Sequence, residues 1–235
     1  MSQRRLVASA VVGFAVLATV ALWRGGGSPA SAPAGDAAPP AAELPASRPQ
    51  EAPFAGRIKG SPTAPITVYE VADFQCPACR VFWEETMPAL EREYVVPGKV
   101  RLIFVNLPLQ EIHPNAAAAH QFAMCAADQG RFWPIHDRLF DQQRAWAPLA
   151  DPTPVFSAMA DSVGLARPAL ETCLGDESVK QRVLQEREGV LRAGVKSTPS
   201  FIIRAGDEQG LFPGAVPIDA WRPILDSLFD KAVGR

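Results

Sequence analysis

Apolar and polar positions alternate with two different periods along the chain. β-branched and aromatic residues dominate 66–71 and 100–105, which predicts two buried strands. Residues 200–204 return to strand character, and 211–214 suggests a hairpin partner. Between these strands, from Asn115 to about Ala193, apolar residues recur at helical spacing. We therefore predict an α/β domain with an inserted helical block at about 115–193.

Local signals divide the helical parts into separate helices. Pro97-Gly98 ends the first of them, Asn115 is a candidate N-cap, and Gly130 and Gly164 are candidate stop signals. The expected helices cover about 77–94, 116–128, 132–142, 156–163, 169–174, 179–191 and 218–232. No internal repeat is visible.

The N-terminus carries a different pattern. Leu6–Trp23 is an uncharged run of 18 residues, about 27 Å long as a helix, which nearly spans a bilayer core. Arg4 and Arg5 precede it, so the positive-inside tendency exports the chain beyond residue 23. We predict a signal anchor at 1–24. A cleaved signal peptide is the main alternative, because Ala30-Ser31-Ala32 has the small-x-small form, and a soluble buried helix is the third interpretation.

Residues 25–56 are rich in Gly, Pro, Ala and Ser and hold few large apolar side chains. Such a segment cannot bury enough surface to fold, so we expect a disordered linker without a binding role. The folded domain is then 57–235. The signal anchor and the cleaved signal peptide both export this domain to an oxidising compartment, where disulfide chemistry is possible.

A C-x-x-C motif, Cys76-Pro77-Ala78-Cys79, falls between the first strand and the first helix. Pro77 suits a first helical turn, and the free N–H groups of that turn favour a thiolate on Cys76. A lowered pKa makes Cys76 the candidate nucleophile, with Cys79 as the less exposed resolving thiol. A structural disulfide or half of a zinc site is the alternative, but no second C-x-x-C or histidine cluster completes a zinc site.

Four spaced motifs resemble the DsbA-like thiol:disulfide oxidoreductases of the thioredoxin superfamily, over about 57–235. They are Ser61-Pro62-x-Ala64-Pro65, Asp73-Phe74-Gln75-Cys76-Pro77-x-Cys79, His113-Pro114-Asn115-Ala116 and Gly194-Val195-x-x-Thr198-Pro199-Ser200-Phe201. The resemblance implies a thioredoxin fold with a helical insertion. It also implies that Pro199 follows a cis bond beside the cysteines, that the backbone of this proline pairs with an extended substrate, and that Thr198 faces the sulfurs. The sequence alone makes trans the default for this bond.

Three further residues are candidates for supporting roles. Glu70 lies six positions before Cys76 in an apolar strand, where an inward carboxyl has a raised pKa and can exchange a proton with Cys79. An outward, solvated Glu70 is the alternative. Cys125 and Cys173 remain as a pair once the motif cysteines are set aside, so we predict a disulfide in the insertion. Two free buried thiols are the alternative.

The remaining polar residues give weaker signals. His113, His120 and His136 do not have the spacing of metal ligands, so we expect solvated or capping roles and no metal site. Asp73 is expected to be a loop or cap residue. The net charge is −2, which gives no global reason to expect nucleic acid as a partner. We expect no cofactor.

These features predict an enzyme that exchanges disulfides with cysteine-containing exported proteins on the periplasmic side of the inner membrane. The resemblance implies a membrane redox partner, either a quinone-linked oxidase or an electron donor. Oxidase is favoured over reductase or isomerase. Strongly oxidising relatives carry histidine where this chain has Ala78, so an intermediate redox potential is expected. A copper-handling thiol module and a chaperone are alternatives from other classes.

Overall fold

The computed structural model describes residues 52–235. The predicted anchor at 1–24 and the linker up to residue 51 lie outside the described residues. The described chain begins with a short 3-10 helix, Ala52–Phe54, and the Phe54 ring contacts Tyr69 with a centroid distance of 6.0 Å. Packing thus begins a few residues before the linker boundary predicted at about 56. Across 52–235, no helix has the length and apolar character needed to cross a bilayer.

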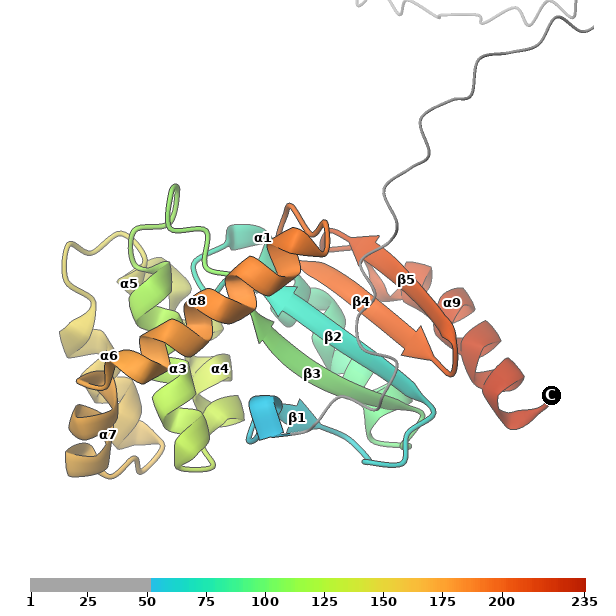
Figure 1. Ribbon diagram of the computed structural model, residues 1–235, viewed down its shortest axis with the longest axis horizontal. Coiled ribbons are helices and arrows are strands. Elements are labelled where there is room, and N and C mark those ends of the chain that lie inside the picture. Colours follow the sequence, from blue (N-terminus) through green and yellow to red (C-terminus); the bar gives the residue numbers. More distant parts are fainter. Residues whose placement is uncertain (1–51) are drawn as a thin grey trace, which may run out of the picture. The chain divides into compact units, whose positions relative to one another are not determined.

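A five-stranded sheet in the order β1-β3-β2-β4-β5 forms the centre of the domain (Figure 1). β2 and β3 are parallel, with Ile66 opposite Val100, and the other neighbouring pairs of strands are antiparallel. The strands are β1 (Ile58–Lys59), β2 (Ile66–Ala72), β3 (Val100–Asn106), β4 (Ser200–Ala205) and β5 (Glu208–Pro213). The four longer strands confirm the predicted pattern. The pattern missed β1, because two residues carry no periodicity.

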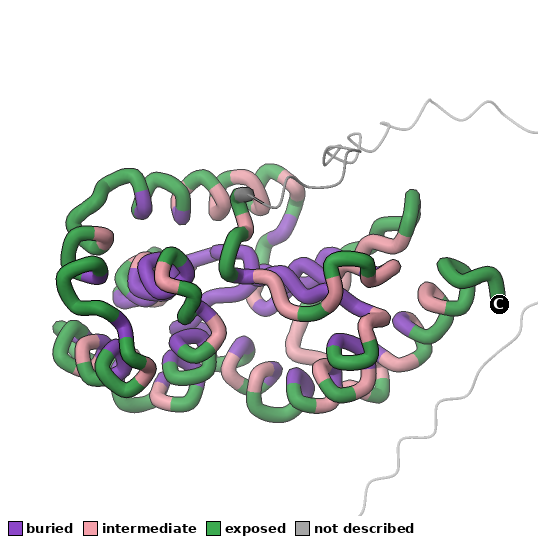
Figure 2. The backbone as a smooth tube through the Cα atoms, turned by 90° about the horizontal axis from the view of Figure 1, so that it is seen from below, coloured by how far each residue is buried: buried purple, intermediate pink, exposed green. Residues whose placement is uncertain are grey.

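Strand alternation sends apolar side chains to both faces of the sheet. On one face, Val68 and Phe201 pack with Phe82, Leu90 and Trp221 from the helices. The opposite face carries a smaller cluster, and α8 crosses it (Figure 1). The helices are α1 (Pro77–Val81), α2 (Met87–Leu90), α3 (Ala116–Asp128), α4 (Phe132–Asp141), α5 (Gln143–Trp146), α6 (Thr153–Ser162), α7 (Arg167–Leu174), α8 (Glu177–Arg192) and α9 (Ile218–Val233). Burial is concentrated along the central strands and the inward helix faces (Figure 2).

The first helical segment does not keep one geometry. It begins at Pro77 and continues to Val95, near the predicted end, but π-helical turns at Phe82–Thr86 and Glu91–Val95 flank α2. Pro88 has no N–H to donate to a carbonyl one turn earlier, which removes an α-helical bond and accounts for the wider turn before α2.

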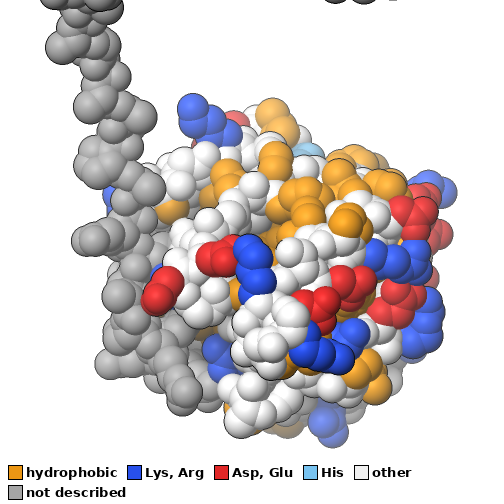
Figure 3. All heavy atoms as spheres, turned by 90° about the vertical axis from the view of Figure 1, so that its right-hand side faces the viewer, with side chains coloured by type: hydrophobic (Ala, Val, Ile, Leu, Met, Phe, Trp, Pro, Cys, Tyr) orange, Lys and Arg blue, Asp and Glu red, His pale blue; other side chains and the backbone are white. Residues whose placement is uncertain are grey.

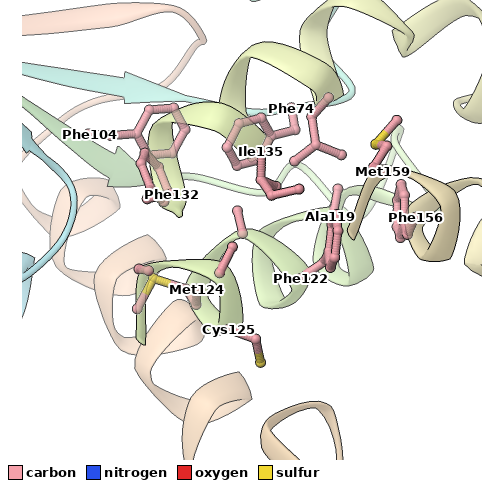
Figure 4. Packing of buried hydrophobic residues seen from close by; sticks show 14 of the residues in the cluster. Phe74, Phe104, Ala119, Phe122, Met124, Cys125, Phe132, Ile135, Phe156 and Met159 are labelled. Carbon is pink, nitrogen blue, oxygen red and sulfur yellow. The ribbon is translucent and has the colours of Figure 1, made fainter. Parts of the chain in front are cut away.

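Helices α3 to α8 form the predicted insertion. Its core is continuous with the motif loop, because Phe74 from that loop packs on Phe104 with a centroid distance of 4.8 Å and on Phe132 at 6.3 Å (Figure 4). The aromatic residues of the insertion form part of this core: Phe122, Phe132, Phe140 and Trp146 are buried, and Trp133 is partly buried. The insertion therefore supports the motif directly.

A disulfide joins Cys125 of α3 to Cys173 of α7, in the pairing expected from the sequence. It closes a loop with a sequence separation of 48. In the chain-entropy model such a closure contributes ~4 kcal/mol to the free energy of unfolding.

We expect the Cys125→Ala/Cys173→Ala double variant to lose about that much stability and to keep the disulfide exchange that the sequence predicts for Cys76 and Cys79. Chemical denaturation under non-reducing conditions measures the first effect, and peptide oxidation the second. Loss of exchange in a variant that remains folded would contradict a purely stabilising role for this disulfide.

The end of the domain that carries β5 and α9 mixes apolar side chains with charges of both signs (Figure 3). Arg222 pairs with Glu93 at 2.8 Å, and Lys231 with Glu208 at 3.0 Å. These exposed pairs each contribute little stability, so the buried Trp221 and Leu225 are what hold α9 on the sheet.

Candidate active site at the start of helix α1

The C-x-x-C motif lies at the junction of β2 and α1, as predicted. Cys76 is the N-cap of α1, with extended backbone (φ −71°, ψ 122°), and Pro77 opens the helix. The exposed fraction of Cys76 is 7%, against 0% for Cys79. Cys76 is less exposed than the sequence suggested, but it remains the more accessible of the two thiols. Pro77 and Ala78 are exposed beside it.

The Cys76 thiol is held by donors that favour its anionic form. A hydrogen bond from the Cys79 thiol is the largest cause that lowers the pKa of Cys76 to about 6, against the opposing effect of burial. The Thr198 side chain and the backbone N–H groups of Cys79 and Ala78 lower this pKa further. Cys76 is thus largely a thiolate at neutral pH, as expected for a nucleophile at a helix N-terminus.

Cys79 has the opposite character. Complete burial, and then the neighbouring Cys76, raise the pKa of Cys79 well above that of a free thiol. The Asp73 N–H donates to the Cys79 Sγ over 3.5 Å, which partly opposes this rise. A proton on Cys79 therefore stabilises the thiolate on Cys76, so the pair combines a favoured thiolate with a protonated thiol.

The loop before β4 lies against these sulfurs. The Thr198–Pro199 bond is cis, the conformation implied by the resemblance. The Cys76 thiol lies 3.5 Å from the Thr198 carbonyl oxygen. On the other side, the Gly214 N–H donates to the Pro199 carbonyl over 2.8 Å. The cis-proline loop is thus fixed between the cysteine pair and the end of β5.

Glu70 faces inward, as strand alternation predicted. It is fully buried, and neither carboxylate oxygen has a hydrogen-bond partner. Burial raises the pKa of Glu70 to about 8, while the charge of Lys59 opposes the rise and Glu91 and Asp137 add to it. Glu70 is therefore mostly protonated at neutral pH and can both give and take a proton near that pH.

Asp73 does more than cap a turn. It is completely buried, and its carboxylate accepts hydrogen bonds from the N–H groups of Gln75 (2.7 Å) and Leu109 (2.8 Å). Its Oδ2 also lies 2.8 Å from the Nδ1 of His113. These contacts tie the motif loop to the segment after β3. The prediction of a solvated or capping role for His113 is therefore wrong, because this histidine pairs with a buried carboxylate.

The same prediction is wrong for the other two histidines, which are completely buried. The Nδ2 of Asn106 donates to Glu186, which fixes the orientation of the amide. The Oδ1 of Asn106 then accepts from the Nδ1 of His120 over 2.7 Å. The Nε2 of His120 is then free to accept from the Phe74 N–H over 3.4 Å. Burial lowers the pKa of His120 to about 4, so the ring is neutral. Burial also lowers the pKa of His136, which lies 2.9 Å from Asp137.

Asn115 also differs from its expected role. It precedes α3, but its side chain makes no capping hydrogen bond. Its Nδ2 instead donates to the carbonyls of Ala147 (3.2 Å) and Leu149 (2.8 Å). No group of three or more His, Cys, Asp or Glu residues suited to a metal ion occurs within 52–235.

Comparison with known proteins agrees with this geometry. The domain resembles the crystal structure of Wolbachia pipientis alpha-DsbA1 with a TM-score of 0.68 and 22% identity, covering 75% of this chain and 92% of that one. The thioredoxin family model matches residues 54–226. The chain is a DsbA-like member of the thioredoxin superfamily.

This DsbA-like chain is similar in sequence to two kinds of curated protein. It is 27% identical to the disulfide bond formation protein D of Bacillus subtilis over 157 residues, which is 62% of this chain and 68% of the relative. It is 32% identical to the Na(+)/H(+) antiporter NhaA 3 of Salinispora tropica over 153 residues, which is 65% of this chain. That match spans only 22% of the antiporter.

Some site residues of this DsbA-like domain have no clear sequence signal. Gln143 donates to the carbonyls of both Phe74 and Cys76, and Gln75 bonds to the main chain at 115 and 147. Gln75 lies within the quoted motif, but the motif does not indicate its contacts, and Gln143 is one of several glutamines in the helical block and does not stand out. Only the fold, which brings α5 against the motif loop, makes their roles visible.

Proposed function

We propose that this protein is a thiol:disulfide oxidoreductase that exchanges disulfides with cysteine-containing proteins through Cys76 and Cys79, and that it acts as an oxidase. The observation that carries this proposal is the pairing of Cys76, the less buried thiol, whose pKa is lowered to about 6, with the completely buried Cys79, whose pKa is raised. A structural disulfide has no need of such a difference. A catalyst of exchange needs a stable leaving thiolate and a protonated partner.

In the oxidising direction the Cys76–Cys79 disulfide is the starting state. A substrate thiolate attacks the Cys76 Sγ, the bond to Cys79 breaks, and Cys79 leaves with the electron pair. Glu70, protonated near neutral pH, supplies a proton to Cys79. A second substrate thiolate then attacks the substrate sulfur of the mixed disulfide and releases Cys76 as a thiolate. The substrate gains one disulfide, and the enzyme is left with two reduced cysteines.

The cis-proline loop supplies the substrate contact in this proposal. Thr198 and Pro199 lie beside Cys76, and an extended peptide there would bring its cysteine to the Cys76 sulfur. The Thr198 side chain lowers the pKa of both cysteines, so it also contributes to their balance. We assign Thr198 and Pro199 to substrate binding and Pro77 and Ala78 to tuning the motif.

The cellular setting is part of the same proposal. The charge-free run at 6–23 would anchor the domain on the periplasmic side of the inner membrane or export it. Exported proteins with paired cysteines are the proposed substrates, and a membrane redox partner would re-oxidise the motif. The similarity to a disulfide bond formation protein supports this interpretation.

Equilibration with glutathione tests both the activity and its direction. Ala78 adds no positive charge beside Cys76, so we expect a reduction potential between those of thioredoxin and DsbA, about −270 and −120 mV. The oxidised protein should transfer its disulfide to a reduced dithiol peptide. Alkylation followed by mass spectrometry measures the reduced fraction in each buffer. A potential below that of thioredoxin would indicate a reductase, and absence of any exchange would contradict the proposed activity.

A further inference from the structure

Gln143 is buried beneath the motif loop, with an exposed fraction of 4%. It is the first residue of α5, in the helical insertion. Its Nε2 donates to the Phe74 carbonyl over 2.8 Å and to the Cys76 carbonyl over 2.9 Å. A side-chain amide nitrogen carries two hydrogens, so both are used on this loop.

Gln75 lies in the motif loop itself, and its side chain bonds to main-chain groups outside the loop. Its Oε1 accepts from the Asn115 N–H over 2.7 Å, and its Nε2 donates to the Ala147 carbonyl over 3.0 Å. Gln75 is also buried, at 8% exposure. The loop from Phe74 to Cys76 is therefore held from both sides by main chain and side chains that belong to the insertion or border it.

The Cys76 carbonyl belongs to the peptide group that links the nucleophile to Pro77. The orientation of this group fixes where the Cys76 side chain lies relative to the N–H groups of Ala78 and Cys79. Those N–H groups favour the thiolate. Because Pro77 has no N–H, this peptide group has only its carbonyl through which a neighbour can hold it. The Arg80 N–H (3.2 Å) and Gln143 are its two donors.

We propose that Gln143 is a positioning residue for the Cys76 thiol, through which the helical insertion sets the reactivity of the motif. By holding two carbonyls of one loop, it keeps Cys76 at the N-terminus of α1 in the orientation that stabilises the thiolate. The inference rests on the proposed thiol exchange. It also assigns the insertion a part in the chemistry beyond covering the core.

The simpler alternative is that Gln143 only satisfies buried carbonyls. The two explanations differ in what a substitution changes. If Gln143 only satisfies carbonyls, its substitution changes the stability of the fold and leaves the reactivity of the Cys76 thiol unchanged. A positioning residue also alters the Cys76 thiolate, which absorbs ultraviolet light and reacts with iodoacetamide.

Gln143→Met, which keeps the length of the side chain and removes both donors, tests this difference. Gln121→Met is the matched control, because Gln121 donates to a single main-chain carbonyl, Leu174, over 2.8 Å, within the insertion. We expect Gln143→Met to alkylate at Cys76 roughly threefold or more slowly at pH 5, as its thiolate fraction falls. Gln121→Met should alkylate at the wild-type rate. Equal rates in all three proteins would overturn the proposal.

A measurement on the wild-type protein covers the case in which Gln143→Met does not fold. The side-chain amide resonances of Gln143 should shift when Cys76 is alkylated, and those of Gln121 should stay in place. An unmoved Gln143 resonance would also overturn the proposal. Neither measurement needs a protein substrate or a direction of electron flow. Failure of peptide oxidation with the expected alkylation difference intact would instead contradict only the proposed function.

Discussion

Serine in place of Cys76 is expected to abolish disulfide exchange, whereas Cys79→Ser is expected to accumulate mixed disulfides with substrates. The difference follows from the positions of the two thiols. Cys76 carries the lowered pKa and lies beside the cis-proline loop, so substrates form their bond with it. Cys79 is completely buried, and its loss leaves the mixed disulfide without an internal thiol to resolve it.

Non-reducing electrophoresis with a disulfide-containing substrate measures both outcomes, because the Cys76 thiolate attacks the substrate disulfide and one substrate cysteine leaves as a thiolate. The Cys79→Ser protein should give a new band that disappears on reduction, and Cys76→Ser should give none. The Cys125→Ala/Cys173→Ala background serves as the control, because it removes the other two cysteines. A mixed disulfide that forms through Cys125 or Cys173 would show that the nucleophile has been assigned wrongly.

Much of the fold follows from the sequence because its elements have strong local signals. The runs at 66–71 and 100–105 became β2 and β3, and the helix expected at 116–128 is α3. Local pattern failed where an element depends on a distant partner. β1 has two residues and exists because it pairs with β3. The π-helical turn at 82–86 depends on one missing N–H, which helical periodicity does not register.

The residues of the candidate site also fall into two groups, those that a local sequence pattern predicts and those that depend on distant parts of the chain. Cys76 and Cys79 have a motif with fixed spacing, and Glu70 has strand alternation, so their placement could be predicted. The histidine environments could not be predicted from spacing, because burial of His120 is produced by Asn106 and Phe74, which are far from it in the chain. The cap expected at Asn115 is absent, and its side chain instead donates from Nδ2 to the carbonyls of Ala147 and Leu149, which are distant in the sequence.

The buried carboxyl of Glu70 is expected to make stability depend on pH in a definite direction. Below its unfolded-state pKa of about 4.5, both states hold the proton, and ionisation costs nothing. Between that value and about 8, the unfolded chain has lost the proton while the folded protein keeps it. Unfolding then releases a proton, so stability falls by ~1.4 kcal/mol per pH unit. The total loss is about 5 kcal/mol.

Other ionisable groups also make stability depend on pH, in pH ranges that overlap that of Glu70. The effect of Glu70 must therefore be measured where these groups do not titrate. His120, whose pKa is lowered to about 4, makes stability rise with pH up to the unfolded value of 6.5, and His136 acts in the same direction. The Cys76 thiol, lowered to about 6 in the reduced protein, would make stability rise between 6 and 9. The oxidised protein between pH 6.5 and 8 therefore isolates Glu70.

In that window, we expect the free energy of unfolding of the wild-type protein to fall by about 2 kcal/mol relative to Glu70→Gln. Glutamine is the matched variant because it keeps the shape of the protonated carboxyl and cannot ionise. Denaturation at pH 6.5, 7 and 8 measures the difference. Parallel curves for the two proteins would mean that Glu70 does not titrate there. It could then not supply the proton that Cys79 takes up when it leaves the disulfide.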